Sequence, residues 1–230
     1  MPHKLSSAVL VAGMLAAAAP AMAERGAFGS GGGAIELGAR LGVGLPFGHE
    51  GAQAGNADPA LSDDVKNLVP IWIDAGYRFT PSFSLGLSFQ YAFGFINKDQ
   101  NPFCTQAASD CSTHDTRVGL NATYHFMPGQ KLDPWVGFGL AYEWLTFEST
   151  VLGVAGSGTA SGTEFANLQV GGDLTASRNV RIGPFASFSF GEYGDFSTEA
   201  NNRTLNGTFA NKSVHEWLIL GVRGAFDVGM

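Results

Sequence analysis

Charged and amide side chains recur at every second position in several apolar stretches of this 230-residue chain. This spacing places them on one face of a β-strand, because successive side chains of a strand point to opposite faces. The charges are mixed in sign, so we expect them to form ion pairs and hydrogen bonds with one another. The predicted interior polar network comprises Arg40, Asp74, Arg78, Gln90, Arg117, His125, Glu143, Gln169, Asp173, Arg181, Arg223 and Asp227.

Two short groups combine a hydroxyl, a histidine and an acid, which are the residue types of acyl transfer and hydrolysis. They are Ser112, His114 and Asp115, and Ser213, His215 and Glu216. Serine and histidine are common in polar loops, so the spacing alone is weak evidence for catalysis. We predict a protein that is not an enzyme, with no catalytic residue, no metal site and no cofactor.

The alternation that places the polar network is clearest in Phe83–Ile96. Every odd position from 83 to 95 is large and apolar, and every even position from 84 to 94 is small or polar. The segment exceeds the roughly 9–11 residues that a tilted strand needs to cross a bilayer. Similar segments recur along the chain. The eight expected strands are Ala34–Leu45, Leu68–Phe79, Phe83–Ile96, Thr116–Phe126, Pro134–Phe147, Gly162–Ala176, Val180–Gly191 and Val214–Val228.

The connections between these strands alternate in length. Residues 80–82, 127–133 and 177–179 form short connections, whereas 46–67, 97–115, 148–161 and 192–213 form long polar ones. An even number of strands with short turns at one end and long loops at the other is the plan of a transmembrane barrel. We therefore predict an all-β fold, a transmembrane up-and-down antiparallel eight-stranded β-barrel, over residues 34–230.

The distribution of charge decides which face of each strand is inside. Nearly all charged residues of the expected strands lie on the small-polar face, and the opposite face is rich in Phe, Leu and Val. A soluble barrel points its apolar residues inward, but these side chains would overfill a narrow eight-stranded interior. We expect the apolar face, including Phe83 to Phe95, to contact lipid, and Ser84, Gly86, Ser88, Gln90 and Gly94 to line the interior.

The N-terminus and the composition give the compartment. Lys4, the apolar run of residues 5–19 and Ala21-Met22-Ala23 form a secretory signal peptide, predicted to be cleaved after residue 23. Residues 24–33 form a flexible Gly-rich segment before the barrel. The net charge of −7 argues against nucleic acid as a partner, because such proteins carry a basic surface. Charged residues make up only 14% of the chain, which suits a large surface in lipid.

Cys104 and Cys111 lie seven positions apart in a polar segment. An exported chain with an even number of cysteines favours a disulfide over free thiols. A metal half-site is disfavoured because no His/Cys cluster surrounds the pair in the sequence. We predict a disulfide that closes a small loop at the long-loop end.

In this plan the chain resembles the small eight-stranded outer-membrane barrels of Gram-negative bacteria, the group that includes the OmpA transmembrane domain, OmpX and OmpW. The resemblance covers the whole mature chain and lies in the plan rather than in a motif. The chain ends Phe226-Asp227-Val228-Gly229-Met230, whereas the usual assembly signal ends on an aromatic residue. The resemblance implies a monomer in outer-membrane lipid, inserted by the barrel-assembly machinery. It also implies a periplasmic N-terminus and long extracellular loops that could bind an external ligand.

Three functions remain open at this stage. A structural or surface-interaction role fits an interior filled by ion pairs, and we favour it. A narrow passage for small or hydrophobic molecules would need voids, which the inward glycines Gly86, Gly94, Gly137, Gly139 and Gly171 could leave. A lipid A-modifying enzyme is the third alternative, since some barrels of this group have that activity, but neither hydroxyl–histidine group shows a His-x-Ser arrangement on a strand.

Overall fold

The computed structural model describes residues 33–106, 109–151, 153–201 and 203–228. The predicted signal peptide and most of the Gly-rich segment lie outside the described residues. Neither helix among the described residues has the length and apolar character needed to cross a bilayer. The elements, in chain order, are β1 (Ala34–Gly48), α2 (Leu61–Asp64), β2 (Val65–Thr80), β3 (Phe83–Ile96), η2 (Pro102–Thr105), β4 (Ser109–His125), β5 (Leu132–Val151), β6 (Val154–Thr175), β7 (Val180–Ala200), β8 (Arg203–Thr208) and β9 (Val214–Val228).

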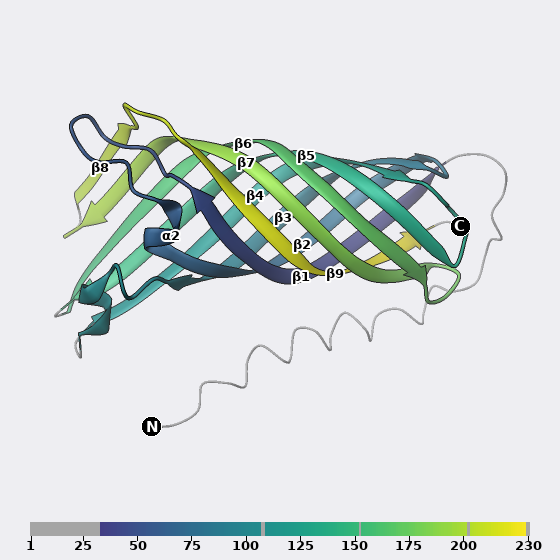
Figure 1. Ribbon diagram of the computed structural model, residues 1–230, viewed down its shortest axis with the longest axis horizontal. Coiled ribbons are helices and arrows are strands. Elements are labelled where there is room, and N and C mark those ends of the chain that lie inside the picture. Colours follow the sequence, from purple (N-terminus) through teal and green to yellow (C-terminus); the bar gives the residue numbers. More distant parts are fainter. Residues whose placement is uncertain (1–32, 107–108, 152, 202, 229–230) are drawn as a thin grey trace, which may run out of the picture.

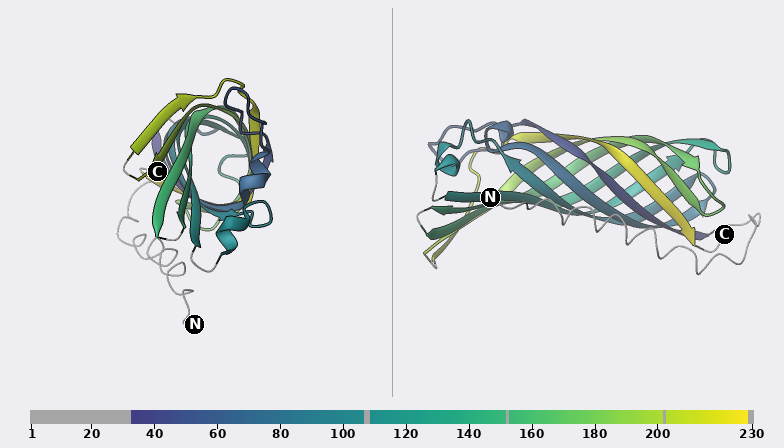
Figure 2. Two further views of the ribbon diagram at one scale, coloured as in Figure 1. Left: turned by 90° about the vertical axis from the view of Figure 1, so that its left-hand side faces the viewer. Right: turned by 90° about the horizontal axis from the view of Figure 1, so that it is seen from below.

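Eight of the described strands close into one antiparallel barrel (Figures 1 and 2), which confirms the predicted fold class. Consecutive strands pair from β1 to β7, and β9 joins β7 to β1 and so closes the ring. The one described strand outside the ring is β8, which pairs only with the last residues of β7. Closure removes the unpaired edges that a flat sheet would expose to lipid.

Side-chain alternation places the apolar face outside. On β3, the exposed fraction is 39% at Phe83 and 62% at Leu87, whereas it is 5% at Ser84 and 2% at Gln90. The same outward rows of Leu, Val and Phe run along the other barrel strands. A belt of large exposed apolar side chains of this extent is stable only against lipid or another apolar surface.

Several strands run further than the sequence pattern indicates at the end of the barrel where the long connections lie, here called the long-loop end. Segments 148–161 and 192–213 were expected to be long polar loops, and that expectation is wrong for most of their length. β5 extends as far as Val151, and β6 already begins at Val154. β7 extends to Ala200, and β8 pairs with its last residues. These extensions project beyond the closed barrel (Figure 1). They are rich in Gly, Ser and Thr, because neither of their faces contacts lipid, and so they lack the apolar alternation that marks a membrane strand.

An apolar layer closes the interior near the long-loop end. Seven buried residues from α2 and five barrel strands pack together there: Leu61, Val65, Leu68, Ala92, Leu145, Tyr193 and Trp217. We call this layer the apolar plug. Leu61 of α2 has no exposed surface, so the first connection folds back into the barrel mouth instead of extending into solvent. The polar network lies in the barrel interior, on the other side of this layer.

Candidate functional site

Below the plug, toward the end with the short turns, three arginines surround one carboxylate. Glu36 on β1 forms ion pairs with Arg78, Arg181 and Arg223 from three other strands; Arg181 Nη2 lies 2.6 Å from Glu36 Oε2. Asp173 and Asp227 complete the group, which we call the Glu36 cluster. Arg223 Nη1 lies 2.8 Å from Asp173, and Arg181 Nη2 lies 3.1 Å from Asp227. Three positive and three negative side chains therefore balance in a buried site.

The middle of the barrel is filled by Arg40. Its guanidinium donates two hydrogen bonds to Asp74, at 2.9 and 3.1 Å, and a third to Gln169 Oε1 at 2.7 Å. Gln169 in turn donates to Asn121, at 2.8 Å. The guanidinium carbon lies 4.2 Å from the centre of the Trp72 ring, so the cation also has an aromatic face as a partner.

Close to the plug, one arginine holds three carboxylates. Arg117 contacts Asp115 at 2.8 Å, Glu164 at 2.6 Å and Glu143 at 3.2 Å. Glu143 also accepts hydrogen bonds from Tyr193 at 2.9 Å and from Trp217 at 3.1 Å, and it lies 3.0 Å from His215 Nε2. We call these residues the Arg117 cluster: Asp115, Arg117, Glu143, Glu164, Tyr193, His215 and Trp217. Two plug residues thus belong to both groups and join the polar interior to the apolar layer.

The structure places all twelve residues of the predicted network on the inner face of the barrel, and brings eleven of them below 9% exposure. Asp74 is the exception, with 14% of its side chain exposed. Gln90 donates to Asp115 at 3.1 Å, and His125 Nδ1 lies 2.8 Å from Asp133 near the short turns. The twelve residues do not form one network, since the Glu36 cluster and the Arg117 cluster occupy different heights of the barrel and share no member.

Sequence reasoning missed four acids of the interior, namely Glu36, Asp115, Asp133 and Glu164. Glu36 and Asp133 follow the same every-second-residue rule as Arg40 and Trp135, so the pattern could have found them. Asp115 was assigned to a loop, but β4 begins at Ser109 and its side chain points inward. Glu164 breaks the rule: a register shift between Glu164 and Ala166 inserts a bulge, so both Glu164 and Asn167 point inward.

The inward glycines do not leave empty space. A side chain on Gly171 would meet Trp135 at 2.5 Å, one on Gly139 would meet Asn121 at 2.4 Å, and one on Gly94 would meet Thr113 at 2.2 Å. The larger neighbour occupies the room that each glycine provides. Two interior cavities next to the polar residues have volumes of only about 10 and 20 Å³, about the space that one water molecule needs. Among the described residues, no three His, Cys, Asp or Glu side chains are arranged to hold a metal ion.

No family model matches the sequence, and no curated protein matches it. Solved structures do match. A major outer membrane protein from Thermus thermophilus superposes with a TM-score of 0.57 at 10% identity, covering 85% of this chain and 99% of that one. The outer membrane protein AlkL gives 0.54 at 14% identity, covering 90% and 95%, and OprG from Pseudomonas aeruginosa gives 0.52 at 10%, covering 87% and 98%. The chain has the fold of the small outer-membrane β-barrels.

The barrel does not assemble either hydroxyl–histidine group. His114 points outward and stacks on Tyr91 with ring centres 5.5 Å apart, whereas the neighbouring Asp115 points inward to Arg117. Ser112 donates to Glu148 instead. In the second group, Ser213 binds Asp58, and His215 lies in the Arg117 cluster. Adjacent residues of a strand face opposite sides, so neither group can converge on one substrate.

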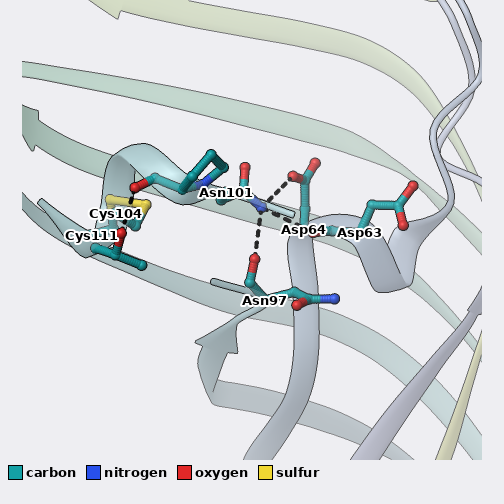
Figure 3. The surroundings of a disulfide bond; sticks show 8 residues. Asp63, Asp64, Asn97, Asn101, Cys104 and Cys111 are labelled. Atoms are coloured by element: carbon teal, nitrogen blue, oxygen red, sulfur yellow. Dashed lines mark hydrogen bonds between the residues drawn. A yellow bond between two sulfur atoms is a disulfide. The ribbon is translucent and has the colours of Figure 1, made fainter. Parts of the chain in front are cut away.

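The disulfide of the barrel is formed as predicted, between Cys104 of η2 and Cys111 of β4 (Figure 3). It fixes η2 to the start of β4, and hydrogen bonds join the residues before η2 to the first connection. Asn101 donates to the backbone oxygen of Asp63 at 2.9 Å, and Asn97 donates to the backbone oxygen of Ser62 at 2.8 Å. The disulfide loop and α2 are therefore held together as one layer at the long-loop end.

Proposed function

We propose that the protein is a sealed outer-membrane barrel with a structural or surface-interaction role. The observation that carries this proposal is the filled interior, in which two ion-pair clusters and Arg40 occupy the lumen below an apolar plug. Buried arginines that each bind two or more acceptors are expensive to separate, because either partner alone would be an unpaired buried charge. Such an interior favours stability of the barrel over conduction through it.

The proposed setting is the outer membrane, with the N-terminus in the periplasm and the long-loop end outside the cell. The protein would act as a monomer, inserted by the barrel-assembly machinery, and present the strand extensions of β5 to β8 and the disulfide-linked layer at the cell surface. A surface of paired strands and stapled loops is more rigid than free loops. Rigidity lowers the entropic cost of binding a partner, which supports a surface-interaction role.

Planar bilayer recording tests the sealed interior. We expect the purified protein to give no steady, reproducible single-channel conductance, whereas a general porin inserted in the same bilayers gives clear steps and shows that insertion is detected. Liposomes that carry the protein should release a small trapped dye no faster than empty liposomes. A stable conductance step, or leakage that rises with the protein-to-lipid ratio, contradicts the sealed interior and favours the passage alternative.

A further inference from the structure

A cavity of about 340 Å³ lies at the long-loop end, separate from the two small cavities of the interior. The lining comes from the first connection and the start of β2, from Asn101, Phe103 and Thr113, and from the long-loop ends of β5, β6 and β7. Its size falls within the range of about 300–1,000 Å³ that small-molecule sites have. Val65 and Leu145 of the apolar plug form part of its lining, so the cavity borders the plug.

The ionisable groups that line this cavity are all acids. Glu50 and Asp64 line it, and none of the described lining residues is a lysine, arginine or histidine. Two further acids lie close by but are bound within the first connection: Asp58 accepts from the amide of Gly51 at 3.0 Å, and Asp63 accepts from the amide of Ala60 at 3.3 Å. Asp64 accepts one hydrogen bond, from Asn101 at 3.3 Å (Figure 3).

Glu50 lacks a partner for one of its oxygens. Its Oε1 atom is buried and has no hydrogen-bond partner among the described residues. Burial, followed by the charge of Asp64 and a hydrogen bond between the two carboxyl groups, raises the pKa of the Glu50 carboxyl to about 8, and the charges of Asp63 and Asp58 add to this. Without a bound ligand Glu50 is therefore neutral at pH 7, because its ionisation would place a second buried negative charge beside Asp64. A cation in the cavity would offset that charge.

Aromatic rings supply the apolar part of the lining. Phe103 of η2 and Phe147 of β5 pack edge to face with ring centres 6.2 Å apart. Phe196, in the extension of β7, also lines the cavity. A cation over such ring faces is attracted by the ring quadrupole, more strongly when it is shielded from water. Acids and aromatic rings together are the combination that recognises a cation with an apolar body.

We propose that this cavity binds a small organic monocation, such as an aromatic or alkyl ammonium compound. The positive group would lie between Glu50 and Asp64, and the apolar body would contact Phe103, Phe147 and Phe196. An anion is disfavoured by the carboxylate of Asp64, and a bare metal ion would find only two carboxyl groups in the lining. The proposal does not depend on a sealed interior, because the cavity lies on the solvent side of the plug.

Calorimetric titration of the full barrel in lipid nanodiscs tests the proposal, with benzyltrimethylammonium as the probe. We expect saturable binding at pH 7, with phenylacetate and the neutral benzyl alcohol at least tenfold weaker. Asp64→Asn should weaken binding of the probe about tenfold, the loss of one charge contact. Asp99→Asn removes the same charge from an exposed position outside the lining and should leave the affinity unchanged.

The pH dependence provides a second readout. Free Glu50 holds its proton up to about pH 8, and a bound cation favours the ionised form, so binding releases a proton at pH 7. The affinity for benzyltrimethylammonium, whose own charge does not titrate, should therefore rise between pH 6 and pH 9. In Glu50→Gln this rise should be absent.

A further variant tests the apolar wall without changing charge. Phe196→Leu should weaken the probe about threefold and leave benzyl alcohol unaffected, because leucine keeps the apolar contact but has no ring face. Folding of every variant is checked by its β-sheet circular dichroism. Equal affinity for the probe and benzyl alcohol, or no change in Asp64→Asn that folds normally, would overturn the assignment.

Discussion

At the residue scale, the barrel interior can hold buried charges because every arginine in it has several hydrogen-bond acceptors. Arg117 contacts three carboxylates, Arg40 contacts Asp74 and Gln169, and Arg223 contacts Glu36 and Asp173. The planar guanidinium suits such sites, since its five N–H groups can serve several oxygens at once without losing charge. A lysine in the same place would satisfy fewer acceptors, which explains why the interior cations are arginines.

Removal of Arg117 should be among the most damaging single changes. Arg117→Met would leave Asp115, Glu143 and Glu164 close together with no arginine between them, and we expect a loss of about 3–5 kcal/mol in the free energy of unfolding. Urea unfolding of the protein in phospholipid vesicles, followed by tryptophan fluorescence, measures the loss. Arg178→Met, in an exposed short turn, is the matched control and should change stability by less than about 0.5 kcal/mol. A loss below about 1 kcal/mol for Arg117→Met would show that the cluster contributes little.

The limits of sequence reasoning at this scale follow from local geometry. The every-second-residue rule places Arg40, Arg117 and Arg223 correctly, because these strands are regular where those residues lie. It also holds at Arg78, which directly precedes a register shift between β2 and β3. It fails at Glu164, since a single inserted residue reverses which side chains face inward, and no residue type in 164–166 marks a bulge. The alternation also cannot predict which arginine pairs with which acid, because partners such as Glu36 and Arg223 are 187 positions apart in the sequence.

At the element scale, the strands have two parts that obey different rules. Within the barrel, an apolar face toward lipid and a polar face toward the interior give a period of two, and the predicted positions of the eight strands hold. Beyond it, residues 148–161 and 195–208 contact water on much of their surface, so Gly, Ser and Thr suffice and the period disappears. Pairing with a neighbouring strand, rather than burial, keeps these extensions regular.

The disulfide should stabilise the long-loop end without affecting the barrel. It closes a loop with a sequence separation of 7, for which chain entropy gives about 2–3 kcal/mol. In a Cys104→Ser/Cys111→Ser double variant we expect faster hydrogen exchange at the amides of Asn101 and Cys104, which bond to Asn97 and Asn101 directly before this loop. Amides of β1 and β9 serve as the internal control and should keep their protection. Equal loss of protection in the barrel strands would show that the disulfide supports the whole fold.

At the scale of the whole molecule, the barrel is asymmetric along its axis. One end has short turns at residues 81–82, 126–131 and 176–179, and the other carries α2, η2, the disulfide and the strand extensions. Polar mass of this kind resists passage through a lipid bilayer, whereas short turns can cross it more easily during insertion. The asymmetry therefore predicts a single orientation, with the long-loop end on the side opposite the assembly machinery.

Surface labelling of intact cells tests that orientation. Lys98→Cys places a thiol in the exposed connection before η2, and Ser177→Cys places one in an exposed short turn. The native cysteines are joined and do not react, so a membrane-impermeant maleimide reports only the new thiol. We expect the Lys98→Cys protein to be labelled on intact cells and the Ser177→Cys protein only after the outer membrane is permeabilised. Both should react equally in detergent, and labelling of Ser177→Cys alone on intact cells would reverse the proposed orientation and place the cation-binding cavity in the periplasm.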